Sequence, residues 1–140
     1  MFFKSVLSLL VLNSATFLLH CSAEMDESMK AVVKMIHDQC IDDTGVGHDV
    51  IDRIFATKNL ENDDKFKCYL ACTLQQISAM DEEGNVDPDV FTGTVPEEYK
   101  PYAESVIEHC KEEGGANACE KAYNLNVCAQ KVDPSKYMLI

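Results

Sequence analysis

The sequence predicts an all-α fold, and three of its features lead to that prediction. Apolar residues recur at spacings of three and four along most of the chain, which places them on one face of a helix. No segment alternates apolar and polar residues as a half-buried strand does. Six cysteines lie beyond residue 23, and an even number in a short secreted domain is typical of a disulfide-linked fold. We therefore expect about six helices in one compact domain, linked by disulfides.

Residues 1–23 have the layout of a secretory signal peptide. Lys4 supplies a positive charge, residues 6–19 are mostly apolar, and a Cys-Ser-Ala segment ending at Ala23 supplies the small residues of a cleavage site. The apolar run is shorter than a transmembrane helix requires, and Ser, Asn and Thr interrupt it. We expect this leader to be removed and residues 24–140 to form one secreted, extracellular domain.

Three helices are expected in the first half of the domain, each marked by one apolar stripe. The first precedes the turn around Gly45, the second follows that turn, and the third begins near Asp64, where negative charge favours a helix N-terminus. The third stripe is the longest and extends to Met80. The three stripes comprise Met29, Val32, Val33, Ile36 and Cys40, then Val50, Ile51, Ile54 and Phe55, then Phe66, Tyr69, Leu70, Thr73, Leu74, Ile77 and Met80.

Three further helices are expected in the second half. Asp87 followed by Pro88 is typical of an N-cap and first helical position, and predicts a short helix through Phe91. The next helix opens at 94–97 and ends at the glycine pair 114–115. The last begins after an Asn117 cap and ends before Pro134, because the residue before a proline disfavours the α conformation. The apolar stripes of these last two helices comprise Tyr99, Tyr102, Ala103, Val106, Ile107 and Cys110, then Cys119, Tyr123, Asn126, Val127 and either Ala129 or Gln130.

The charge of the chain excludes some partners. With 12 Lys and Arg against 24 Asp and Glu, the formal net charge is −12, and loss of the leader with its single lysine makes the domain more acidic still. Nucleic acids and anionic lipid surfaces repel such a protein. We expect neither as a partner.

The cysteines of the expected domain permit fifteen pairings, and helix geometry removes some of them. Cys68 and Cys72 lie four residues apart on one helix and point the same way, so they are poorly placed to bond to each other. Cys119 and Cys128 lie about 13 Å apart on a continuous helix, which is too far for a disulfide. Ten pairings remain. A zinc site is the alternative, but it normally needs two close cysteine pairs and the chain offers one.

The cysteine spacing, Cys-x27-Cys-x3-Cys-x37-Cys-x8-Cys-x8-Cys, resembles that of the insect odorant-binding proteins of the general and pheromone-binding type. The segments "IHDQC", "KCYLAC" and "DPSKYMLI" share the resemblance, which covers residues 24–140. It implies six helices around an internal apolar pocket, with disulfides Cys40–Cys72, Cys68–Cys119 and Cys110–Cys128. It also implies a carrier that reversibly binds an odorant, a pheromone or a similar lipophile, without catalysis, cofactor or metal.

The C-terminal tail adds a possible gate. It ends in Tyr137, Met138, Leu139 and Ile140, an apolar ending that would be unfavourable if left in water. In family members with similar endings, the tail folds across the pocket as a lid. The resemblance implies a latch between the terminal carboxylate of Ile140 and the side chains of His37 and Tyr69. A packed histidine and a packed tyrosine are the alternative.

The stripes and the resemblance together give a set of candidate ligand-binding residues. Ordinary core packing is the alternative for each of them. Their apolar walls with a few hydroxyls suit an uncharged ligand with one polar end, which Tyr99, Tyr123 or Tyr137 would contact. The candidates are Val33, Ile36, His37, Ile77, Phe91, Val95, Tyr99, Ala103, Val106, Tyr123, Val127, Tyr137 and Leu139.

Two other functions fit parts of the sequence. One is a lipophile carrier or scavenger outside olfaction, in another secreted fluid. The other is a hydrolase, because His37-Asp38-Gln39-Cys40 is similar to a segment of secreted phospholipases A2, in which the histidine is a base and the aspartate a calcium ligand. Calcium needs several oxygen ligands, and the glycine-rich loop that supplies them in that family is missing here. Beyond the ligand, a membrane receptor or a second copy of the chain is left open as a partner.

Overall fold

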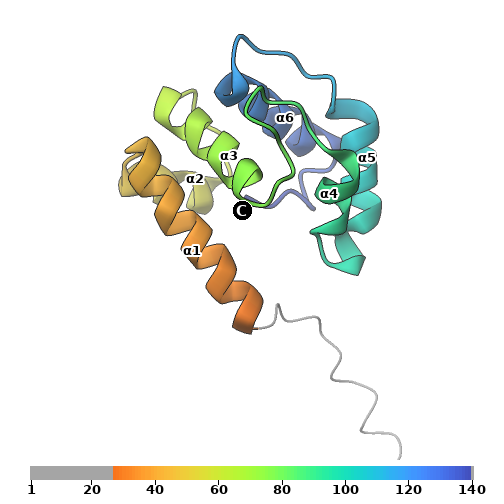
Figure 1. The fold of residues 1–140 in the computed structure, drawn as a ribbon, viewed down its shortest axis with the longest axis horizontal. Coiled ribbons are helices and arrows are strands. Elements are labelled where there is room, and N and C mark those ends of the chain that lie inside the picture. The colour runs from red at the N-terminus through yellow and green to blue at the C-terminus, as the bar shows by residue number, and fades with distance from the viewer. Residues whose placement is uncertain (1–26, 140) are drawn as a thin grey trace, which may run out of the picture.

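The computed structural model describes residues 27–139, which form an assembly of helices without a sheet (Figure 1). The predicted signal peptide and Ile140 of the predicted latch lie outside the described residues. Within the described part no helix is long and apolar enough to cross a membrane. The elements are α1 (Glu27–Thr44), α2 (His48–Thr57), α3 (Asp64–Gln76), α4 (Pro88–Gly93), the 3₁₀ turn η1 (Glu97–Tyr99), α5 (Lys100–Cys110) and α6 (Ala118–Val132).

Side chains cap the helices where the sequence predicted caps. Asp87 accepts hydrogen bonds from the backbone N–H groups of Asp89 and Val90, and Pro88 follows it as the first residue of α4. At α6, the Asn117 side chain accepts from the N–H of Glu120 at 3.0 Å. These bonds satisfy N–H groups that have no partner within the helix. The predicted starts of α4 and α6 are confirmed.

The third helix is shorter than its apolar stripe predicted. It ends at Gln76 rather than near Met80, because Ser78 adopts a left-handed conformation with φ of 59°. The N–H of Ala79 then donates to Leu74 O and that of Ser78 to Gln75 O, both at 2.9 Å, which is the hydrogen-bond pattern of a Schellman cap. Met80 is buried in the loop beyond, in a bridge to Val86, so its place in the stripe came from burial and not from helical periodicity.

Two of the three disulfides of the described residues involve α3 and make it the centre of the fold. Cys40–Cys72 joins α1 to α3, Cys68–Cys119 joins α3 to α6, and Cys110–Cys128 joins α5 to α6. This is the pairing that the family resemblance implied. Figure 1 shows α3 in the middle of the molecule with α1 on one side and α6 on the other. Phe66 and Tyr69 of α3 are among the largest fully buried side chains, so the core lies along this helix.

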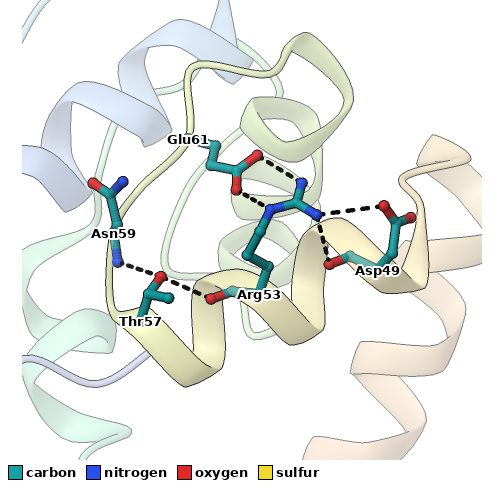
Figure 2. A network of polar contacts seen from close by, with 5 residues as sticks. All are labelled: Asp49, Arg53, Thr57, Asn59 and Glu61. Atoms are coloured by element: carbon teal, nitrogen blue, oxygen red, sulfur yellow. Dashed lines mark hydrogen bonds and ion pairs between the residues drawn. The ribbon is translucent and has the colours of Figure 1, made fainter.

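A polar network holds α2 against the segment that leads into α3 (Figure 2). The Arg53 guanidinium donates to both carboxylate oxygens of Glu61, with Nη2 and Oε2 3.0 Å apart, and also lies near Asp49. The hydrogen bond from Arg53 lowers the pKa of Glu61 and keeps it charged. At the end of α2, the Thr57 hydroxyl donates to Arg53 O and accepts from the N–H of Asn59. The network fixes how α2 turns into the next segment.

Candidate ligand-binding cavity

A cavity of about 90 Å³ lies between α3, α4, α5, α6 and the C-terminal tail. One water molecule needs roughly 10–15 Å³ in a cavity, so this space is several times larger. It is lined mainly by apolar side chains, which is typical of small-molecule sites. The lining comprises Leu70, Thr73, Leu74, Phe91, Val95, Tyr99, Tyr102, Ala103, Val106, Leu125, Asn126, Ala129, Lys136, Tyr137 and Met138.

Small side chains on two helices leave this space open. Ala103 of α5 and Ala129 of α6 are both buried and both line the cavity. A larger residue at either position would fill part of the volume between the helices. Val106, one turn from Ala103, and Leu70 of α3 are buried and add apolar surface to the lining. The inward faces of α3, α5 and α6 therefore produce a hollow rather than a filled core.

The polar groups that line the cavity are mostly satisfied within the protein. Tyr102 donates to Ala129 O at 2.9 Å, Tyr137 donates to Asn126 Oδ1 at 3.0 Å, and Thr73 donates to Leu70 O at 2.9 Å. Burial raises the pKa of Tyr102 to about 12, with a further contribution from the charge of Asp133. Burial also raises the pKa of Tyr137. Both phenols therefore stay neutral, and the cavity wall offers few free polar groups.

The C-terminal tail folds back to close one side of this cavity. After α6, the backbone N–H groups of Lys136 and Tyr137 each donate to Asp133 O at 3.1 Å. The Asp133 carboxylate accepts from the Ser135 hydroxyl and N–H, and these bonds hold its pKa below the usual range. Tyr137 is then only 4% exposed. The tail is part of the cavity wall.

On the other side of the tail lies a more open groove between α1 and α2. It is lined by side chains that include Val33, His37, Phe55 and Leu139. His37 Nδ1 and the Tyr69 hydroxyl oxygen are 2.7 Å apart, within hydrogen-bond distance, and their rings meet edge to face. Tyr69 is fully buried, which raises its pKa to about 12. The structure therefore brings two of the three predicted latch residues together, with Leu139 in the same groove as His37.

The structure distributes the predicted ligand-binding residues over three places. Six of them line the cavity: Phe91, Val95, Tyr99, Ala103, Val106 and Tyr137. Three line the groove between α1 and α2: Val33, His37 and Leu139. The remaining four line neither: Ile36, Ile77, Tyr123 and Val127.

Helix geometry explains why those four residues lie elsewhere. Ile36 lies on α1 and packs in the protein core, and no residue of α1 lines the cavity. Ile77 would continue the cavity face of α3, but the helix ends one residue before it. Val127 is two residues, or about 200°, from the cavity-lining Leu125 on α6. The Tyr123 hydroxyl donates to Leu60 O at 3.3 Å, so the structure directs this predicted polar contact away from the cavity.

Several cavity residues were absent from the predicted set. Six of these nine residues belong to the predicted apolar stripes: Leu70, Thr73, Leu74, Tyr102, Asn126 and Ala129. Met138 belongs to the tail that was predicted to fold across the pocket. Leu125 and Lys136 had no signal, because periodicity does not say how α6 is rotated or which tail residues face the cavity.

The geometry around His37 differs from that of a calcium-dependent hydrolase. The Asp38 carboxylate pairs with Lys34 on the surface of α1, and that hydrogen bond lowers the pKa of Asp38. Within residues 27–139 no group of three or more His, Cys, Asp or Glu side chains is arranged to hold a metal ion. His37 contacts two aromatic rings, those of Phe55 and Tyr69.

Known proteins are similar to this chain in both sequence and fold. General odorant-binding protein 69a of Drosophila melanogaster is 24% identical over 105 residues, which are 75% of this chain and 71% of the fly protein. The crystal structure of the Locusta migratoria odorant-binding protein lmigOBP1 is 30% identical with a TM-score of 0.71, over 76% of this chain and 83% of the locust chain. The medfly protein CcapOBP22/CcapOBP69a is 29% identical with a TM-score of 0.67, over 74% and 90%.

The family match covers most of the sequence. The model of the PBP/GOBP family matches residues 22–132. This span includes the six paired cysteines and helices α1 to α6, and the C-terminal tail lies beyond it. The predicted resemblance is confirmed: the chain belongs to the PBP/GOBP family, whose members are carriers rather than enzymes, and the solved structures that it is similar to are insect odorant-binding proteins.

Proposed function

We propose that this protein is a secreted carrier that binds a small hydrophobic ligand reversibly in the cavity between α3, α4, α5, α6 and the tail. The observation that supports this most directly is an apolar hollow whose lining tyrosines Tyr102 and Tyr137 already donate hydrogen bonds inside the protein. Burial of an apolar ligand there gains roughly 25 cal/mol per Å², and the hydroxyls of Tyr102 and Tyr137 keep their partners. The ligand undergoes no chemical step.

Displacement of a hydrophobic fluorescent probe by volatile alcohols, esters and fatty acids tests the carrier function. Ala103→Phe places a ring in the cavity and should lower the affinity for the probe at least tenfold, because the ring occupies the ligand's volume. Ala31→Phe, on the exposed side of α1, is the matched control and should bind as the original protein does. Equal affinity in both variants would place the ligand elsewhere.

We further propose that the tail is a lid held by the Ile140 carboxylate. The proximity of His37 Nδ1 and the Tyr69 hydroxyl, together with the place of Leu139 in the same groove, supports a latch at this point. A terminal carboxyl group ionises near pH 3.3–3.7, so strong acid removes its charge and weakens any such bond.

Removal of Met138 to Ile140 tests the lid. The shortened protein should bind the probe more weakly and should lose the part of the acid dependence that comes from the latch. Ile140→Val keeps the carboxylate and is the control, which should behave as the full chain does. Identical affinities and identical pH profiles in the shortened and full-length proteins would contradict the latch.

A further inference from the structure

One charged side chain lines a cavity that is otherwise apolar or internally hydrogen-bonded. Among the described residues that form its wall, Lys136 is the sole residue with a formal charge. It lies in the tail and is exposed to solvent, whereas Leu70, Ala103 and Val106 of the same lining are buried. The cavity therefore runs from an apolar interior to a cationic mouth.

The ammonium group of Lys136 is available to a ligand. No carboxylate of the described residues lies within 4.0 Å of Lys136 Nζ, and the contact that the structure records is with the ring of Tyr99, 5.8 Å from its centroid. The positive charge of Lys136 contributes to the lowered pKa of Asp133, but the side-chain hydrogen bonds to that carboxylate come from Ser135. A cation–π contact of an exposed lysine is weak, so a ligand with a stronger acceptor readily replaces it.

Tyr99 adds a neutral donor at the same mouth. It is half-buried, and unlike Tyr102 and Tyr137 its hydroxyl has no hydrogen-bond partner among the described residues. An ammonium and a phenol that lie side by side can donate to two oxygen atoms that share a negative charge. An alcohol or an aldehyde offers one neutral oxygen and gains less from the pair.

We propose that Lys136 and Tyr99 select ligands that carry a carboxylate on an apolar chain. The chain occupies the cavity against Val106 and Leu70, and the carboxylate lies at the mouth between the ammonium and the phenol. This inference rests on the proposed carrier function, and it departs from the sequence-based expectation, which was an uncharged ligand with one polar end. Lys136 carries no signal in the apolar pattern, so the sequence did not point to it.

The test compares decanoic acid with 1-decanol at neutral pH, since the two share a chain and differ in the head group. The measurement is displacement of a neutral fluorescent probe. The original protein should bind the acid more tightly than the alcohol. Lys136→Met keeps the apolar stem but removes the charge, and should weaken the acid about tenfold while changing the alcohol less than about twofold. Lys131→Met, on the exposed last turn of α6, is the matched control and should change neither.

Two further variants separate charge from packing. Lys136→Arg keeps the positive charge and should keep the preference for the acid. Tyr99→Phe keeps the ring and should weaken the acid less than Lys136→Met does. Equal weakening of acid and alcohol in Lys136→Met, or no weakening of either, would overturn the proposal. If the original protein binds neither compound, the carrier function itself is contradicted. If it binds both with equal affinity, only the proposed ligand class is contradicted.

Discussion

At the scale of single residues, the hydroxyl groups around the cavity differ in whether the protein already satisfies them. Tyr102 and Tyr137 donate to other parts of the fold, whereas the Tyr99 hydroxyl has no partner among the described residues. Their sequence neighbourhoods are alike, because each tyrosine lies beside apolar and charged residues. Which of the predicted contacts, Tyr99, Tyr123 or Tyr137, faces a ligand depends on tertiary packing and could not be read from spacing.

The buried hydroxyl of Tyr69 makes stability sensitive to alkali. Its pKa in the folded state is about 12, against about 10 for an exposed tyrosine, because burial disfavours the phenolate. Below pH 10 both states hold the proton, and the stability is fully present. As the pH rises from 10 toward 12 the unfolded chain ionises first, so the folded state loses stability.

Urea unfolding at several pH values between 8 and 11.5 measures this loss. In Tyr69→Phe the midpoint should fall less over pH 10–11.5 than in the original protein, because one of the titrating groups is gone. The fall that remains comes from the other tyrosines with raised pKa values, Tyr102 and Tyr137. Parallel curves for the two proteins would show that Tyr69 is not the group responsible.

At the scale of the helix, starts were easier to predict than ends and rotations. Asp87-Pro88 and Asn117 act through hydrogen bonds within three residues, so their sequence context contains the whole signal. The end of α3 is set by a left-handed residue that is usually glycine and here is Ser78, so the usual signal is missing. The rotation of α6, which directs Leu125 and Ala129 to the cavity and Val127 away, depends on its neighbours.

A glycine at position 78 tests the cap that ends α3. A left-handed conformation costs a residue with a side chain roughly 1–2 kcal/mol, and glycine avoids this but loses more entropy on folding. Ser78→Gly should therefore raise the free energy of unfolding by about 0.5 kcal/mol. Ser105→Gly, inside α5, is the control and should lower it by about 0.5 kcal/mol. Destabilisation by Ser78→Gly, measured by urea unfolding, would contradict the proposed cap.

At the scale of the whole molecule, the disulfides compensate for a hollow interior. A cavity forfeits packing contacts that a filled core would supply, and three cross-links, two of them on α3 and one between α5 and α6, keep the helices together around it. Helix geometry alone left ten pairings, because it excludes partners on one helix but does not say which helices are neighbours. The fold class followed from periodicity, whereas the pairing followed from the family resemblance.

The lengths of the closed loops predict how much each of two disulfides stabilises the fold. Cys68 and Cys119 are 51 residues apart in sequence, and Cys110 and Cys128 are 18 apart. Loop-closure entropy gives about 4 kcal/mol for the first and about 3 kcal/mol for the second. Replacing the first pair by serines should therefore lower the urea midpoint more than replacing the second. The reverse order would show that local strain or residual structure outweighs loop length.

The central claim is that the hollow between α3, α4, α5, α6 and the tail is the ligand site. A crystal structure of the protein with a bound lipophile such as 1-decanol or decanoic acid tests it most directly. The account predicts that the chain of the ligand lies against Val106, Ala103 and Phe91, with Tyr137 covering it and its polar end toward Tyr99 and Lys136. A ligand found instead in the groove between α1 and α2, beside Val33 and Phe55, would contradict it.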